Sequence, residues 1–255
     1  MKTMKQRLLA LAAVTLGLHG AAQAGPVLST SYGSLLGSTI TFNELAADLL
    51  NGLVVSGGVT FGERFAGQVL AVTKAPRPGV VAQDWFDDLS TGAPTAGLTV
   101  LAGANDHNLG TYDYGDARGN ALAGIGPTMA DGADPFGFGS ISARFASGQS
   151  GLGFYLRDGD GGSATLALYR ADGSLIQSLL LSGVSDGYYA FTREGGVADI
   201  AGFSLYSRDS YYGMSIDDLR LGSAAARVPE PSSALLLGVA LCGLGGVRRF
   251  GRKQA

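Results

Sequence analysis

The chain has 255 residues and a formal net charge of −3, with 18 basic and 21 acidic side chains, two histidines and one cysteine. This balance excludes nucleic-acid binding, which needs clustered Lys and Arg against phosphates. The single cysteine, Cys242, excludes an internal disulfide and a Cys-rich zinc site. Glycine, with 41 residues, is about twice as frequent as the usual ~7%. Together with the low content of charged residues, it predicts many short strands joined by turns.

The first 24 residues predict an export signal. Three basic residues precede an apolar run over residues 8–18, and the segment closes with Ala22-Gln23-Ala24. These are, in order, the three parts of a secretory signal peptide, with small residues at the cleavage site. We therefore expect a helical signal peptide over residues 1–24, recognition of Ala22 and Ala24 by signal peptidase, and a mature chain that begins at Gly25.

The other end of the chain predicts a single membrane span. Pro229-Glu230-Pro231 precedes an apolar run over residues 232–247, and Arg248 and Arg249 begin a basic terminus. As a helix, the run would be about 24 Å long, slightly less than the ~30 Å hydrocarbon core, so it would span with local thinning or snorkelling. The basic end should stay in the cytoplasm, which places the body of the protein outside the inner membrane.

A Pro-Glu-Pro triplet, a Gly-rich apolar span and a terminal Arg cluster, in this order, resemble the PEP-CTERM sorting signal of Gram-negative bacteria. In that family a membrane protease-transpeptidase, exosortase, recognises the triplet and cuts the tail. The resemblance implies that residues 227–255 form a sorting tail in which Pro229, Glu230 and Pro231 are recognition residues. It also implies an inner-membrane precursor that is passed to the cell surface or extracellular matrix. An ordinary single-span anchor that is never cleaved is the alternative.

Residues 25–226 predict one all-β ectodomain. Short alternating or apolar runs recur between clusters of Gly, Asp, Ser and Asn, which is typical of a sandwich or barrel. In the run over residues 140–145, Ile141, Ala143 and Phe145 should share the buried face of a strand. Further strands are expected at residues 38–42, 59–61, 69–73, 98–101, 151–157, 188–192, 200–206 and 214–221.

Two local predictions concern a hairpin and a helix. Asp172-Gly173 separates the strand-like residues 164–169 and 175–181, and Asp-Gly favours the positive φ angles of a tight hairpin. Residues 43–50 predict a short helix, because two leucines lie one turn apart and Gly52 can end it.

The glycine-rich run of residues 151–157, the Asp-Gly hairpin and the last strand, Ser215-Ile216-Asp217-Asp218-Leu219, also carry a resemblance. They are similar to the jelly-roll, carbohydrate-binding-like ectodomains often found before this sorting tail. The resemblance implies a jelly-roll-like antiparallel β-sandwich, and it bears on the fold more than on a ligand.

Two acidic pairs predict a structural Ca²⁺ site. Asp158 and Asp160 flank a glycine in a turn, and such turns present carboxylate and carbonyl oxygens well. Asp217 and Asp218 are consecutive in a strand, so one of them should face the core unless a bulge intervenes. A buried carboxylate needs a cation or several donors. Calcium and an internal arginine are the two solutions, and a solvated acidic turn is the alternative for Asp158 and Asp160.

Three aromatic residues in expected loops are candidate ligand-binding residues. Trp85 lies between acidic residues, and Tyr112 and Tyr114 lie in a Gly- and Asp-rich segment. Sugar rings stack on such faces while carboxylates accept hydrogen bonds from the hydroxyl groups. The alternative is that Trp85 and one tyrosine fold back onto the core.

The sequence leaves two functions open. The first is a non-enzymatic exported surface or matrix protein that binds exopolysaccharide. The second is a jelly-roll glycoside-active enzyme with two catalytic carboxylates, for which the candidates are Asp84, Asp87, Asp106, Asp113 and Asp116. Ser185 fits a Gly-x-Ser-x-Gly pattern, but it lies between two expected strands and a turn is the ordinary explanation. His107, the single histidine of the expected mature chain, cannot build a catalytic zinc site alone.

Overall fold

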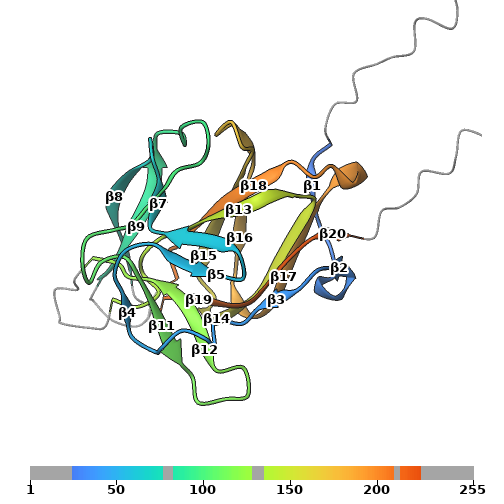
Figure 1. Cartoon of the computed structure of the whole chain (residues 1–255). Helices are drawn as coiled ribbons and strands as arrows, with labels where there is room; N and C mark the ends of the chain where they lie inside the picture. The colour runs from blue at the N-terminus through green and yellow to red at the C-terminus, as the bar shows by residue number, and fades with distance from the viewer. Residues whose placement is uncertain (1–24, 77–82, 128–134, 210–212, 225–255) are drawn as a thin grey trace, which may run out of the picture.

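The computed structural model describes residues 25–76, 83–127, 135–209 and 213–224, which form a β-sandwich (Figure 1). An eight-stranded and a six-stranded sheet carry most of the chain, and every strand pair is antiparallel. These residues contain no α-helix, only the short 3-10 turns η1 (Tyr32–Ser34) and η2 (Glu194–Gly196). The predicted all-β class is confirmed.

The eight-stranded sheet has the order β1-β17-β14-β19-β12-β11-β4, and β3 also pairs with β19. Its strands are β1 (Val27–Ser29), β3 (Thr39–Ile40), β4 (Leu49–Leu50), β11 (Leu109–Asp113), β12 (Asn120–Gly124), β14 (Gly151–Asp160), β17 (Ser185–Arg193) and β19 (Ser215–Leu221).

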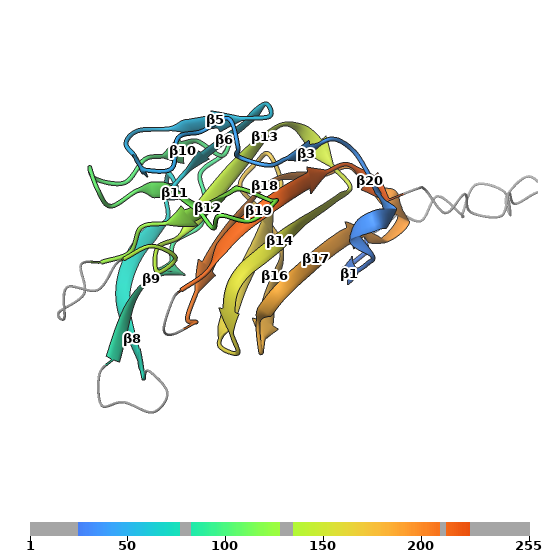
Figure 2. The same cartoon turned by 90° about the horizontal axis from the view of Figure 1, so that it is seen from below.

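The six-stranded sheet has the order β16-β15-β18-β13-β6-β5. Its strands are β5 (Val54–Ser56), β6 (Val59–Gly62), β13 (Ile141–Gln149), β15 (Ser163–Tyr169), β16 (Leu175–Ser182) and β18 (Ile200–Ser207). Three small pairs complete the fold: β2 (Leu35–Leu36) with β20 (Ser223–Ala224), β7 (Arg64–Phe65) with β10 (Val100–Leu101), and β8 (Val69–Pro76) with β9 (Gln83–Thr91). The β8–β9 hairpin projects from one end of the sandwich (Figure 2).

One apolar core joins the two sheets. Alternate residues of a strand point to one face, and Phe154 and Leu156 of β14 are fully buried in the same cluster as Leu166 and Leu168 of β15. The face predicted for β13 is confirmed, since the cluster also contains Ile141, Ala143 and Phe145. The alternation of apolar residues therefore decides which side of each sheet packs in the core and which side faces outward.

From β13 onward the chain passes repeatedly between the two sheets through short connections. Strands β13, β15, β16 and β18 belong to the six-stranded sheet, whereas β14, β17 and β19 belong to the eight-stranded sheet. Gly161 and Gly183 lie at two of the crossings, with φ angles of 91° and 63°, which residues with a side chain rarely adopt. The connection between β13 and β14 is the single residue Ser150, because β13 continues to Gln149 and β14 begins at Gly151.

The predicted Asp-Gly hairpin forms, with a different turn. Residues of β15 and β16 pair in antiparallel register. Gly173 has a φ of 84°, and Asp172 is not among the residues with positive φ. Arg170 N–H donates to Ser174 O at 2.9 Å, so the hairpin closes over a longer loop than the two-residue turn expected from Asp-Gly.

The helix predicted over residues 43–50 is wrong. These residues form turns and bends that end in β4, where Leu49 and Leu50 pair with β11. Asn43 is held away from a helical path because its side chain donates to Arg118 O at 2.9 Å and accepts from Asn120 N–H at 2.7 Å. An isolated helix of this length is marginal, so tertiary contacts decide the conformation.

The predicted signal peptide, residues 1–24, the Pro-Glu-Pro motif and the span over residues 232–247 lie outside the described residues. Within the ranges that the structure describes, no helix is long and apolar enough to cross a membrane.

Candidate functional site

Five tyrosines gather on the outer side of the eight-stranded sheet, and we call this surface the tyrosine face. They are Tyr32, Tyr112, Tyr114, Tyr155 and Tyr188. In β14 the side chains of Tyr155 and Arg157 point away from the core because Phe154 and Leu156 point into it. Tyr155 lies directly opposite Tyr188 of β17 and Asp217 of β19. Figure 2 shows β17, β14 and β19 side by side, with β12 and β11 next in the sheet.

The rings are in contact with one another. Tyr32 stacks on Tyr188 with ring centroids 4.2 Å apart, and Tyr188 meets Tyr155 edge-on at 4.9 Å. On β11 and the residue that follows it, Tyr112 and Tyr114 meet edge-on at 4.9 Å. Both geometries are favourable for aromatic pairs. From β17 to β11 the face crosses four strand spacings, or roughly 19 Å.

Two arginines fill the space between the tyrosines. The Arg118 guanidinium lies 4.0 Å from the centroid of the Tyr155 ring, and the Arg157 guanidinium lies 4.5 Å from that of Tyr114. Arg118 comes from the β11–β12 loop, which thereby folds over the sheet. These cation–π contacts join the two groups of tyrosines into one surface.

An ion-pair network centred on the buried Arg157 lies beneath the tyrosine face. Arg157 is 4% exposed and donates to both carboxylate oxygens of Asp116, at 2.8 and 2.9 Å. It also donates to Asp217 Oδ2 at 3.2 Å. Hydrogen bonds from Arg157 hold the pKa of Asp116 far below its usual range, whereas burial raises the pKa of Asp217. A calcium ion and an internal arginine are the two groups expected to compensate a buried carboxylate. In the described residues, the arginine Arg157 pairs with Asp217.

A β-bulge settles the orientation of the Asp217 and Asp218 pair. The pairing of β14 with β19 shifts between Gly153 and Tyr155, and Asp218 has a φ of 49°. Both carboxylates therefore lie on the outer side, where Asp218 Oδ2 accepts from Tyr188 Oη at 3.0 Å. Leu219 returns to the core. The bulge thus supplies two adjacent carboxylates to the same face.

The other acidic pair lies at the end of β14. Tyr114 Oη donates to Asp158 Oδ2 and lies 2.8 Å from Ser215 Oγ. Asp160 N–H and Gly162 N–H donate to the carboxylate of the buried Asp209 at 2.7 and 2.6 Å. Burial raises the pKa of Asp158 and of Asp209.

The predicted calcium site has no ready ligand set in the described part of the chain. No group of three or more His, Cys, Asp or Glu residues there is placed to hold a metal ion. Asp217 faces Arg157, Asp218 faces Tyr188, and Asp158 faces Tyr114. Calcium binding by Asp158, Asp160, Asp217 and Asp218 stays a prediction.

Two of the tyrosines remain open to solvent. Tyr112 is 49% exposed and Tyr188 is 47% exposed, while the other three are half-buried. The exposed rings are held by ring contacts and, at Tyr188, by the hydrogen bond to Asp218. The face thus offers pre-positioned aromatic surface beside the half-exposed carboxylate of Asp116, whose side chain is 51% exposed.

Trp85 does not join the tyrosine face. It lies in β9, not in a loop, and is half-buried against Phe86 and Phe138. Tyr112 also lies in a strand, β11, where Tyr114 follows the strand end. The expectation that these aromatics occupy loops is therefore wrong for Trp85 and Tyr112, because Trp85 pairs with Lys74 of β8 and Tyr112 pairs with Ala121 of β12.

The candidate catalytic residues are dispersed. Asp113 accepts from Gly115 N–H, Asp116 binds Arg157, and Asp106 is exposed in the β10–β11 loop. The side chain of Asp84 is outside the described part. Ser185 begins β17 and is not on a strand-to-helix elbow, and His107 Nδ1 lies 3.1 Å from Gly126 O.

Asp87 has a different environment from the other candidates. It is 8% exposed. Burial, reinforced by the neighbouring Glu63 carboxylate, raises the pKa of Asp87 to about 7, against the opposing effect of His107 and Arg64. Sequence reasoning included Asp87 but missed Glu63, since nothing in the pattern around Glu63 distinguishes a buried carboxylate from a solvated one.

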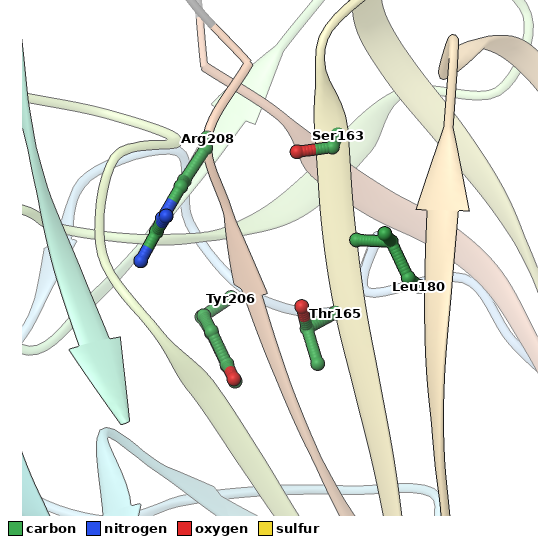
Figure 3. Close-up of a pocket in the computed structure, with 5 residues that line it drawn as sticks. All are labelled: Ser163, Thr165, Leu180, Tyr206 and Arg208. Atoms are coloured by element: carbon green, nitrogen blue, oxygen red, sulfur yellow. The ribbon is translucent and has the colours of Figure 1, made fainter. Parts of the chain in front are cut away.

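A shallow pocket lies on the outer side of the other sheet (Figure 3). It is lined by Ser163, Thr165, Leu180, Tyr206 and Arg208. These described lining residues include no carboxylate, so the pocket offers no acid–base pair for glycoside hydrolysis.

Sequence reasoning placed Tyr112 and Tyr114 at the site but missed three tyrosines and two arginines. The sequence pattern does indicate the orientation of Tyr155 and Arg157. In Gly-Phe-Tyr-Leu-Arg they alternate with two apolar residues, so in a strand they face away from the core. No local signal identifies Tyr32, which reaches the site from the start of the domain. Its hydroxyl donates to Asp218 O at 2.6 Å.

Replacement of Arg157 should destabilise the fold in a pH-dependent way. Arg157→Met removes the charge that faces the buried Asp217, so we expect a loss of about 3–5 kcal/mol in the free energy of unfolding at pH 8. The loss should be smaller at pH 5, where the buried Asp217 takes up a proton more readily. Urea denaturation at both pH values measures it. Arg118 is the control, because its side chain is 33% exposed and its Nη1 lies 3.8 Å from Asp218 Oδ2. Arg118→Met should lower the free energy of unfolding by about 1 kcal/mol or less. Equal losses in the two variants would contradict a special role for Arg157 in the ion-pair network.

Replacement of Asp87 should change the pH dependence of stability. The folded chain holds the Asp87 proton up to about pH 7, whereas an unperturbed aspartate loses it near 3.8. The free energy of unfolding should therefore fall as pH rises through this window, at up to about 1.4 kcal/mol per pH unit. Asp87→Asn should be more stable than wild type at pH 8 and similar to it at pH 4 in thermal denaturation. Asp106→Asn controls for the lost charge, and an unchanged pH profile in Asp87→Asn would refute the prediction.

No family model matches the chain, and no curated protein matches it. What the site can bind therefore follows from the chemistry of its own side chains.

Proposed function

We propose that this chain is an exported, non-enzymatic surface or matrix protein that binds exopolysaccharide through the tyrosine face. The observation that carries the proposal is the pair of exposed rings, Tyr112 and Tyr188, held in a continuous aromatic and arginine layer. Loops and outer faces of a rigid sandwich are common places for binding sites. The proposal extends to a jelly-roll-like arrangement of the sandwich, supported by the repeated passage of the chain between the sheets.

The chemistry of the face suits a sugar chain. Tyrosine rings offer apolar surface to sugar rings, and their hydroxyls offer polar partners at the edge. Asp116 and Asp218 accept hydrogen bonds from hydroxyl groups, and Arg118 donates them. Because the rings are fixed by contacts in the free protein, little side-chain freedom is lost when a ligand stacks on them.

The ends of the chain support export and sorting. The signal-peptide pattern ends at Ala24, and Pro229-Glu230-Pro231, the apolar run and the arginine cluster follow in the order typical of a PEP-CTERM tail. In this proposal signal peptidase removes residues 1–24, and an exosortase-type protease acts on the inner-membrane precursor. The protein then reaches the cell surface or the extracellular matrix.

Binding is tested with residues 25–226 and exopolysaccharide from the host. Tyr112→Ala and Tyr188→Ala should each weaken retention about tenfold, which corresponds to the ~1.4 kcal/mol expected of one stacking contact. Val55→Ala, an exposed apolar position on the other sheet, should bind as wild type does. Affinity electrophoresis measures the change. Equal binding by all variants would remove the tyrosine face as the site, and binding that a chelator abolishes would instead favour the predicted calcium site.

Sorting is tested separately in the host. Replacement of Pro229, Glu230 and Pro231 by alanine should leave an unprocessed precursor in the inner membrane. Cell fractionation and the mass of the mature chain report the outcome. The matched control replaces Ser232 and Ser233, which adjoin the triplet, by alanine and should be processed normally. Unchanged processing of the triplet variant would refute recognition of Pro229-Glu230-Pro231, and a wild-type chain that keeps its tail would identify an uncleaved anchor instead.

One observation favours the alternative of a glycoside-active enzyme. Asp87, with a pKa raised to about 7, has the protonation state required of a general acid, and Glu63 is a neighbouring carboxylate. Release of reducing ends from the exopolysaccharide, lost in Asp87→Asn but retained in Tyr112→Ala, would support this function over binding alone.

A further inference from the structure

The edge strand β16 is unlike the other described edges of the two large sheets. The two large sheets end at β1, β4, β5 and β16. The first three have three, two and three residues, whereas β16 has eight. Proteins commonly protect sheet edges by keeping them short or by placing charges or proline on them. Residues 175–182, Leu-Ile-Gln-Ser-Leu-Leu-Leu-Ser, contain neither charge nor proline.

The outer edge of β16 presents main-chain groups that pair with no strand of the described residues. Gly183 N–H donates to Gly162 O, and alternate residues of an antiparallel strand turn their main-chain groups to opposite sides. Following the register, Leu181 and Leu179 bond to β15. Ser178, Leu180 and Ser182 therefore point their N–H and C=O groups away from the sheet, where no described strand pairs with them.

The side chains of β16 are also incompletely covered. Leu180 is 69% exposed and Leu175 is 52% exposed. On the core side, Leu179 and Leu181 are half-buried, although their partners on β15, Leu166 and Ala164, are at most 2% exposed. The apolar layer of the sandwich thus extends to the free edge of β16. Figure 3 shows Leu180 beside Thr165 on the outer side of this sheet.

We propose that the free edge of β16 pairs with the same edge of a second copy of this chain, in antiparallel orientation about a two-fold axis. The pairing joins two six-stranded sheets into one continuous sheet. Hydrogen bonds between the main chains supply the contact, and the half-covered leucines of each copy meet those of the other.

The distribution of charge favours contact between two copies at the uncharged β16 edge over contact at other surfaces. Residues 25–227 carry 20 acidic and 11 basic side chains, so most surfaces of two copies repel each other. The uncharged β16 segment removes this repulsion where the copies meet. An antiparallel edge is also self-complementary, since one patch serves both copies, as a two-fold interface requires.

The test measures the mass of the full chain in detergent by light scattering, with the detergent contribution subtracted. Wild type should shift from monomer to dimer as its concentration rises. Leu180→Lys places like charges on both sides of the two-fold axis and should raise the dimer dissociation constant at least tenfold. Ser178→Lys, at a second exposed position of the same edge, should do the same. Val55→Lys, 66% exposed on the opposite edge strand, is the matched control and should dimerise as wild type does.

Circular dichroism and thermal denaturation establish that each variant is folded. A wild-type chain that stays monomeric at all concentrations would overturn the proposal. It would also be overturned if both β16 variants dimerised as wild type does, or if Val55→Lys alone became monomeric.

Discussion

A single buried guanidinium organises the outer side of the eight-stranded sheet. Arg157 extends from β14 between Asp217, which is fully buried, and Asp116, which belongs to the loop above. Removing a carboxylate from water is costly unless a charge or several donors compensate it. Arg157 compensates the charge of Asp217 and also forms an ion pair with Asp116 in the β11–β12 loop. This ion pair holds the loop against the sheet, where Arg118 of the same loop contacts the Tyr155 ring. The arrangement of the side chains in the tyrosine face thus depends on the compensation of the buried Asp217 charge by Arg157 beneath it.

The two surfaces singled out by the structure belong to different sheets. The tyrosine face covers the outer side of the eight-stranded sheet, and β16 is an edge of the six-stranded sheet. Paired copies would therefore keep both tyrosine faces free. A polysaccharide offers many repeated binding sites, and two linked faces gain avidity on such a ligand without any new contact. The proposed pairing and the proposed binding are thus compatible, though neither depends on the other.

The second half of the chain was largely predictable, and the first half was not. Apolar alternation over residues 140–145 and the Asp-Gly hairpin led to β13, β15 and β16, because these strands bury one face in a common core. The helix expected at residues 43–50 failed because Asn43 and the β4 leucines bond to distant strands. Trp85 and Tyr112 were expected in loops because polar and glycine neighbours suggest turns, yet strands with one solvent-facing side have the same composition.

The sequence by itself determined the all-β class and the buried face of β13, since each depends on residues close together in the chain. For a buried member of the Asp217 and Asp218 pair, it also limited the compensating group to a calcium ion or an internal arginine. Only the tertiary structure showed that Arg157 is the group that pairs with Asp217. It also placed Asp218 in a β-bulge and stacked Tyr32 on Tyr188. Such contacts join residues far apart in the chain, and which of them form depends on sheet order and register. Neither is encoded in any local pattern.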